Sequence, residues 1–312
     1  MKFSMPGGPF DMRNYSGRAD LLLLQHFASA ALALRFPLDA TWHPGDFSWQ
    51  LMPDYDRGHR VRLWLNEGAV QAVAMFEAPG RLLLEILPAC VALLPGIIAH
   101  AERSTLRAGQ PALFVRVYDS DQDRIAALTR LGYAKVENEG AIFRVDLSQP
   151  LPARDLPPGF RIRDCVGIDP ARRARAHRDA WNDLSEIGLP DARSSFTTEV
   201  YDGLRKAPDY DPALDILIEA ANGELVANLI CWSDDKSRIG SLEPVGTHAR
   251  YRKRGLARAA ILEGLRRLRK RGMKYGRVST AHFNRPAIAA YASSGFTLVD
   301  RASWWSKTLN AP

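Results

Sequence analysis

Apolar positions between residues 239 and 272 follow two different periods. The run Ile239–Thr247 is largely apolar and extended, which favours a strand. From there to Gly272, apolar residues recur at helical spacing, at Leu256, Ala260, Ile261, Leu265 and Leu268. The pattern therefore predicts a strand that feeds a short turn containing Gly255, and a helix that the turn opens.

The same pattern occurs twice along the chain. The segment Asp121–Tyr133 aligns without gaps on Asn284–Phe296, with an offset of 163 residues at every position. Upstream of each segment, an apolar strand meets a glycine-containing turn and returns as a second apolar strand, in Arg62–Phe76 and in Asp215–Ile230. Between the copies lies the proline-rich connector Leu151–Pro158, which resists helix and strand alike. The chain is therefore expected to contain two related copies of one fold.

The turn after the second strand combines cations with small residues. A helix begins with free N–H groups and with the positive end of its macrodipole, so a diphosphate docked there is held by both. Gly255 lets the backbone approach closely, and Ala257 is small enough not to block the approach. We therefore expect a pyrophosphate site formed by Arg252, Lys253, Arg254, Gly255, Leu256 and Ala257.

A second motif begins 32 residues after Arg252 and reads N-x-x-A-x-x-x-Y-x-x-x-G-F, from Asn284 through Tyr291 to Phe296. With the hexapeptide Arg252-x-x-Gly255-x-Ala257, it resembles the GNAT superfamily of acetyl-CoA-dependent N-acyltransferases, whose signature is Q/R-x-x-G-x-G/A. The alanine in the last position is a permitted variant. The resemblance implies acetyl-CoA as cofactor, with Asn284 among the residues that bind it.

The resemblance also implies a chemistry, in which an amine attacks the acetyl thioester directly. A base must deprotonate the amine, and the departing thiolate gains from a proton donor. Tyr291 stands at the family's usual general-acid position, with a purely structural core tyrosine as the alternative. Glu243 is the candidate base, unless it is only solvated or paired with an arginine. The family's other base position, two residues earlier, is Ser241, which is no base.

Two histidines near the same segment, His248 and His282, are alternative bases, although each is more simply a solvated or capping residue. In the family the strand splays from its neighbour, and its freed backbone groups pair with the pantetheine arm. Pro244 cannot donate, so the expected partners are Val245, Gly246 and Thr247. No metal-binding, P-loop or nucleophile-elbow motif is present, so we expect no metal site.

The expected fold class is α/β (α+β), with two tandem GNAT folds, each a mixed, mostly antiparallel twisted sheet flanked by helices. We assign residues 1–150 to a degenerate GNAT-like domain, 151–158 to a linker, and 159–312 to a catalytic GNAT N-acetyltransferase domain. In the first copy the turn is replaced by a segment that contains Pro88, Pro95 and no basic residue. There, Leu128 and Asp121 occupy the tyrosine and asparagine positions. We therefore expect one cofactor per chain, and a first copy kept for packing or for shaping the substrate cleft.

Length, composition and charge limit the remaining functions. A chain of 312 residues with 46% hydrophobic content is long enough for two domains. The net charge of +7 is concentrated between Arg250 and Arg277, which span 12 basic residues and the single acid Glu263. A solvated helix face and an anion-attracting turn explain this block better than nucleic-acid binding, because no nucleic-acid motif accompanies it. We expect no nucleic-acid partner.

The three cysteines, Cys90, Cys165 and Cys231, are far apart in apolar or strand-like surroundings, which indicates free buried thiols in a reducing compartment. The N-terminal segment lacks the apolar core of a secretory signal, and no apolar stretch is long enough to span a bilayer. A cytoplasmic protein without a membrane partner is expected.

The acceptor is expected to approach the region Ala180–Phe196, where Asp183, Glu186 and Asp191 would suit a cationic amine unless they are merely solvated. The sequence favours an N-acetyltransferase that acts on a primary amine of a small molecule or peptide, as a monomer or a homodimer. The alternative is a non-catalytic acyl-CoA-binding or interaction protein. Such a module needs the turn but neither Glu243 nor Tyr291, so the presence of both favours the enzyme.

Overall fold

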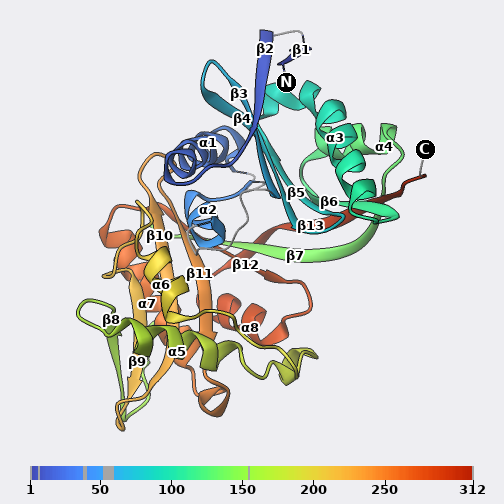
Figure 1. Ribbon diagram of the computed structural model, residues 1–312. Coiled ribbons are helices and arrows are strands. Elements are labelled where there is room, and N and C mark those ends of the chain that lie inside the picture. The colour runs from blue at the N-terminus through green and yellow to red at the C-terminus, as the bar shows by residue number, and fades with distance from the viewer. Residues whose placement is uncertain (1, 6–7, 38–40, 52–59, 154, 311–312) are drawn as a thin grey trace. The chain divides into compact units, whose positions relative to one another are not determined.

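The computed structural model describes residues 2–5, 8–37, 41–51, 60–153 and 155–310. Arg154 of the expected linker and Met1, Pro6 and Gly7 of the N-terminal segment lie outside the described residues. The chain forms two compact units (Figure 1). Unit 1 comprises residues 1–42, 56–141 and 300–312, and unit 2 comprises residues 43–55 and 142–299.

Unit 1 is a sheet with helices packed against it. Its strand order is β1-β2-β3-β4-β5-β6-β13, and the neighbouring pairs are antiparallel except for the parallel pair β5–β6. The strands are β1 (Lys2–Met5), β2 (Gly8–Asn14), β3 (Val61–Asn66), β4 (Ala69–Ala78), β5 (Arg81–Ile86), β6 (Ala112–Tyr118) and β13 (Thr297–Thr308). The helices are α1 (Arg18–Arg35), the 3-10 helix η2 (Pro88–Leu93), α3 (Leu94–Arg107) and α4 (Gln122–Arg130).

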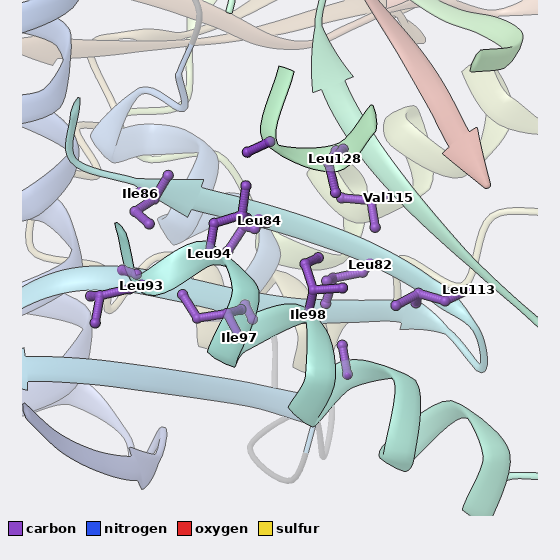
Figure 2. Close-up of a cluster of buried hydrophobic side chains, with 14 of the residues drawn as sticks. Leu82, Leu84, Ile86, Leu93, Leu94, Ile97, Ile98, Leu113, Val115 and Leu128 are labelled. Carbon is purple, nitrogen blue, oxygen red and sulfur yellow. The ribbon is translucent and has the colours of Figure 1, made fainter. Parts of the chain in front are cut away.

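The core of unit 1 follows from two periodicities in the sequence. Leu82, Leu84 and Ile86 alternate along β5 and share one face of the sheet, while Ile97 and Ile98 belong to the apolar stripe of α3. Figure 2 shows these side chains meeting between the helix and the strands. Their burial stabilises the unit by roughly 1.5–3 kcal/mol for each large side chain.

Unit 2 has the strand order β7-β12-β11-β10-β9-β8, in which β8–β9, β9–β10 and β10–β11 are antiparallel and β11–β12 is parallel. The strands are β7 (Ala134–Asp146, within unit 2 from Ile142 onward), β8 (Phe160–Asp164), β9 (Asp215–Ala220), β10 (Leu225–Asp234), β11 (Ile239–Thr247) and β12 (Tyr275–Ala281). The helices are α2 (Pro44–Leu51), α5 (Pro170–Trp181), α6 (Thr198–Leu204), α7 (Leu256–Lys270), α8 (Arg285–Ser293) and the 3-10 turns η3 (Ser185–Ile187) and η4 (Ala249–Tyr251).

Helices of unit 2 cover both faces of β10. On one face α7 approaches closely at Gly264, where an added Cβ would lie 2.6 Å from the Cys231 sulfur. On the other face Trp232 packs with α5 and α6. A fully buried ion pair ties α5 to β9, since Arg173 Nε lies 2.8 Å from Asp215 Oδ1. These contacts fix the carboxyl end of α5, which borders the candidate site.

The internal repeat extends well beyond the aligned segments. Strand β6 becomes β12 and helix α4 becomes α8 when 163 is added to their bounds, and the strands that follow, β7 and β13, begin with the same offset. Asp121 and Asn284 cap α4 and α8 in the same way, each accepting a hydrogen bond of 3.2 Å from the backbone N–H three residues later. The predicted fold class, mixed and mostly antiparallel sheets flanked by helices, is confirmed.

The compact units exchange segments across the division expected from the sequence. Strand β13, which ends the second copy, pairs with β6 of unit 1 from Ala302↔Tyr118 to Thr308↔Ala112. The described residues of the expected linker, 151–153 and 155–158, form neither helix nor strand. The division into 1–150, 151–158 and 159–312 stays a prediction about the two sequence copies.

All three cysteines are free, but they differ in burial. Cys165 and Cys231 are buried, whereas Cys90 is half-buried and donates to Gln71 Oε1 at 3.2 Å, so its expected full burial was wrong. Within the described residues, no helix combines the length and the apolar character needed to cross a membrane.

Candidate functional site

The central feature of the candidate site is the point where β11 leaves β12. Their parallel pairing consists of Ile239↔Tyr275, Gly240↔Gly276 and Ser241↔Arg277, whereas the pairing of β11 with β10 continues to Thr247. From Leu242 onward β11 therefore stays on β10 alone. This is the splay that the sequence resemblance implied.

A β-bulge lies where the strands separate. Leu229 pairs with Val245 and Cys231 pairs with Leu242, so one residue of β10 faces the two residues Glu243 and Pro244 of β11. Trp232 Nε1 donates a hydrogen bond of 2.7 Å to the Glu243 carbonyl and holds the bulge in place. Glu243 is half-buried.

Beyond the bulge, backbone groups of β11 alternate in direction. His248 N–H donates to the Val226 carbonyl at 2.9 Å, and antiparallel pairs alternate, so we infer that Gly246 directs its backbone groups towards β10. Val245 and Thr247 then direct theirs to the open side, where the Thr247 carbonyl accepts from Arg252 Nε at 3.2 Å. Thr247 Oγ1 is buried without a hydrogen-bond partner among the described residues. A pantetheine arm, which carries amide donors and acceptors, fits this edge.

Gly246 allows α5 to pack directly on β11. An added Cβ would overlap the Trp181 ring and lie 2.8 Å from the Ala180 Cβ. Trp181 stacks on His177, with ring centroids 4.2 Å apart. Burial, and then the nearby charge of Arg173, lowers the pKa of His177 well below its ordinary value, so this imidazole is neutral at neutral pH. An aromatic wall therefore borders the open edge of β11.

The predicted diphosphate turn has the expected backbone geometry. Gly255 is the N-cap of α7 with a φ of 77°, and no heavy atom lies within 4 Å of the position that a Cβ would take. The first hydrogen bond within the helix runs from Ala259 N–H to the Gly255 carbonyl at 3.0 Å. The N–H groups from Gly255 to Arg258 thus have no intrahelical acceptor, and none of the described residues caps them through a side chain. Leu256 is buried and anchors the turn, and Ala257 follows it. The turn fits a bound diphosphate.

The cations of this turn have separate tasks. The Arg252 guanidinium donates to the Thr247 carbonyl at 3.2 Å, the Ala180 carbonyl at 3.0 Å and the Asp183 carbonyl at 2.9 Å, so it ties the turn to β11 and to the end of α5. Lys253 is exposed and its Nζ pairs with Glu186 at 2.9 Å. The Arg254 guanidinium lies 5.3 Å from the Tyr251 ring centroid. Arg252 is therefore a clamp, while Lys253 and Arg254 supply charge at the surface.

Helix α8 carries the other predicted residues. Asn284 caps the helix through its side chain, and Tyr291 is buried between Phe143 and Phe296, with ring centroids 5.9 and 6.0 Å away. Burial, and then the negative charge of Glu243, raises the pKa of Tyr291 well above its ordinary value. The two candidate catalytic groups therefore influence each other, and the phenol stays protonated at neutral pH.

The two histidines differ from a free base. His248 caps η4, because its Nδ1 accepts from Arg250 N–H at 3.1 Å while its Nε2 lies 3.6 Å from Glu224 Oε1. His282 lies in the turn before α8, with its ring 5.4 Å from that of Phe283. Among the described residues, no group of three or more histidine, cysteine, aspartate or glutamate side chains could hold a metal ion.

Sequence reasoning missed one carboxylate beside β11. Asp46 on α2 has its Oδ1 3.5 Å from the Ser241 hydroxyl, at the position where the family's second base would stand. Helix α2 is held there by His43, whose Nε2 lies 3.0 Å from the Ile239 carbonyl, and by the close contact of Gly45 with Trp232. The sequence gives no signal for this contact, because the two residues are 195 positions apart and belong to different sequence copies.

Two of the three acids in the expected acceptor region are engaged locally. The Asp183 carboxylate accepts from the Ser185 hydroxyl and N–H, which lowers its pKa. Glu186 pairs with Lys253. Of the three, Asp191 is the one without an ion pair to any described residue, which narrows the expected attraction of a cationic amine to that side chain.

The first copy has apolar side chains at both candidate catalytic positions. Arg81 pairs with Phe114 as Ser241 pairs with Arg277, and the repeat offset of 163 relates the two partners. Leu83 therefore takes the place of Glu243, as Leu128 takes the place of Tyr291. The helix start differs as well, since η2 runs directly into α3 and Leu94 N–H already donates to Val91 O.

The comparisons with known proteins agree with this geometry. Residues 181–296 match the sequence model of the Acetyltransferase (GNAT) family, and this span includes the splayed strand, the turn and Tyr291. The GNAT resemblance inferred from the two motifs is confirmed.

Curated relatives match about half of the chain. Mycothiol acetyltransferase from Thermobispora bispora is 33% identical over 163 residues, which is 49% of this chain and 52% of that protein. Mycothiol acetyltransferase from Thermomonospora curvata is 31% identical over 150 residues, which is 47% of this chain and 48% of that protein. The matched part of the chain thus spans about half the length of these relatives.

Solved structures match nearly the whole chain. A tandem GNAT protein from the clavulanic acid biosynthesis pathway has a TM-score of 0.66 at 16% identity, covering 97% of this chain and 99% of that one. A GCN5-related N-acetyltransferase from Sphaerobacter thermophilus has a TM-score of 0.60 at 20% identity, covering 97% and 96%. These likenesses confirm a fold of two tandem GNAT copies.

The contact between α5 and β11 can be tested at Gly246. Gly246→Ala forces Trp181 away from the strand, so we expect a loss of about 1–3 kcal/mol in the free energy of unfolding, measured by urea denaturation. Gly96→Ala is the matched control, because its added Cβ meets no heavy atom within 4 Å and its φ is not positive. An equal effect of the two substitutions would contradict the packing role of Gly246.

Proposed function

We propose that this protein is an acyltransferase that moves an acetyl group from acetyl-CoA to a primary amine of a small molecule or peptide, at unit 2. The observation that carries this proposal is the convergence of three features on one strand. The edge of β11 opens beyond Ser241, the N–H groups at the start of α7 lack partners, and Glu243 and Tyr291 interact electrostatically.

The described residues would hold acetyl-CoA along β11 and at the start of α7. Val245 and Thr247 offer backbone groups to the pantetheine arm, and Thr247 Oγ1 is a further buried group that lacks a partner. The N–H groups from Gly255 to Arg258 would receive the diphosphate, in the field of Lys253 and Arg254. Acetyl-CoA supplies the reaction with an acyl group activated as a thioester.

Glu243 and Tyr291 divide the proton transfers between them. Glu243 takes a proton from the acceptor nitrogen, directly or through water, and so frees the lone pair for attack. Tyr291 stays protonated because of its burial and of the Glu243 charge, so it is able to donate its proton to the departing sulfur. The charge of Glu243 that serves the first step therefore also keeps the phenol in the form needed for the second.

The acceptor is the least constrained part of the proposal. The aromatic wall of Trp181, His177 and Phe196 borders the open edge of β11, and Asp191 is the acid left to attract a cationic amine. The names of the curated relatives support acetyl transfer, and we do not carry their acceptor over to this chain. Free cysteines accord with a reducing compartment, and we propose a cytoplasmic location on that ground.

Replacing Tyr291 by phenylalanine tests the acid. We expect Tyr291→Phe to lower kcat by about 10- to 10³-fold with little change in acetyl-CoA affinity, because only the proton donor is removed. An acid with a raised pKa is lost only as the pH rises through that raised value, so wild-type activity should show no decline from this group up to about pH 10. Steady-state rates from pH 6 to 10 measure both effects, and a phenylalanine variant with full kcat would remove Tyr291 from the mechanism.

Replacing Glu243 by glutamine tests the base. We expect kcat/KM of the wild type to rise with pH to a plateau, as the base and the acceptor amine lose protons. Glu243→Gln should lower kcat by about 10²- to 10⁴-fold and remove the contribution of this base to the profile. Asp46→Asn is the paired variant, since Asp46 is the other carboxylate beside β11. A larger loss in Asp46→Asn than in Glu243→Gln would transfer the role to Asp46.

Isothermal titration calorimetry with CoA tests the inequality of the copies. One CoA should bind per chain, because η2 already occupies donors at the start of α3 whereas those of α7 are free. Gly255→Trp places a bulky side chain in the diphosphate space and should abolish binding. Ala92→Trp, at the corresponding position 163 residues earlier, should leave it unchanged. Two sites in the wild type, or one surviving site in Gly255→Trp, would show that unit 1 binds the cofactor.

A further inference from the structure

Unit 1 contains a cavity of about 260 Å³ between α3, β3 and β4, away from the positions that correspond to the catalytic residues. Arg62 and Trp64 alternate along β3 and reach the cavity from the sheet, as does Phe76 from β4. Ile97, His100, Ala101, Ser104 and Thr105 line it from α3, at the spacing of a single helix face. Figure 2 shows Ile97 on the part of α3 that faces the sheet.

The cavity is open because small side chains face each other across it. Ala74 of β4 stands directly opposite Arg62 in the sheet, and Ala101 and Ala108 stand on the helix above. Protein interiors are otherwise packed to the density of organic crystals, and an unfilled space costs stability. The alanines therefore leave room for a molecule of modest size, over an apolar floor that includes the buried ring of Trp64.

The cavity has a positive electrostatic character. Arg60 and Arg62 line it, and the described lining contains no aspartate or glutamate. Arg62 is half-buried and forms no ion pair with any described residue. Burial, and then the charges of Arg62, Arg103 and Arg107, lowers the pKa of His100, which shows that the cations act on the interior of the site.

A buried hydroxyl in the cavity wall has no partner. Thr105 is 1% exposed, and its Oγ1 forms no hydrogen bond with any described residue. Its neighbour Ser104, by contrast, donates to the His100 carbonyl at 3.0 Å. An unpaired buried hydroxyl costs about 1–3 kcal/mol, a cost that a bound hydrogen-bonding group removes.

We propose that this cavity is a binding site for a small aromatic or aliphatic acid, a carboxylate or a phosphate ester. The apolar body of the ligand would rest on Trp64, Phe76 and Ile97, and its anionic group would lie between Arg62 and the Thr105 hydroxyl. The site is separate from acetyl transfer at unit 2, so either proposal can fail without the other.

Ligand titration followed by NMR tests the proposal on the full chain. The probes are phenylacetate and phenyl phosphate, which distinguish the two anion types, with benzyl alcohol and benzylamine as the neutral and cationic counterparts. We expect at least one anionic probe to saturate and to shift an indole N–H resonance that is absent from Trp64→Phe. The neutral and cationic probes should bind at least about tenfold more weakly, because they lack the charged hydrogen bond to Arg62.

Three variants complete the experiment. Arg62→Gln should weaken the anionic probe by about tenfold or more, and Thr105→Val, which keeps the side-chain shape, should weaken it severalfold. Arg130→Gln on the exposed face of α4 is the matched control and should leave binding unchanged. Saturation by neither anion, equal binding of benzylamine, or full affinity in both Arg62→Gln and Thr105→Val would overturn the proposal. Thr105→Val remains informative if Arg62→Gln fails to fold.

Discussion

The departure of β11 from β12 after Ser241↔Arg277 is the constraint on which the candidate site depends. A strand that leaves its neighbour must have its backbone groups satisfied elsewhere, because buried unpaired N–H and C=O groups are costly. Here β10 holds one edge, Trp232 holds the bulge, and Arg252 binds the Thr247 carbonyl. The remaining groups of Val245 and Thr247 form an edge that an extended amide-containing ligand can complete.

The two copies show how one topology can keep or lose a site. Both have a parallel pair of strands, a following helix and a capped second helix at the same offset. In the second copy a left-handed glycine begins α7 and leaves its first N–H groups open, whereas in the first copy η2 leads into α3 and uses such groups internally. The leucines at 83 and 128 fill the space of the catalytic pair. Unit 1 instead opens a cavity on the face of its sheet that α3 covers.

Much of the fold and part of the site could be predicted from the sequence, because these features depend on local rules. Helical and strand periods placed α7 and β11, and the gapless repeat predicted two copies whose elements coincide in the structure. The glycine at 255 and the asparagine cap at 284 also act locally, through backbone conformation and a hydrogen bond three residues away. These features need no knowledge of distant contacts.

Tertiary structure decided the rest, because it depends on which distant side chains meet. Sequence could not show that Arg252 would bind the carbonyls at the end of α5, that Glu186 would pair with Lys253, or that Asp46 would lie beside Ser241. The exchange of β13 into unit 1 likewise follows from strand pairing over a long separation. The sequence by itself determined the elements, their repeat and the local chemistry of the turn. Packing alone determined the partner of each charge, since short-range patterns carry no record of side chains nearly two hundred residues away.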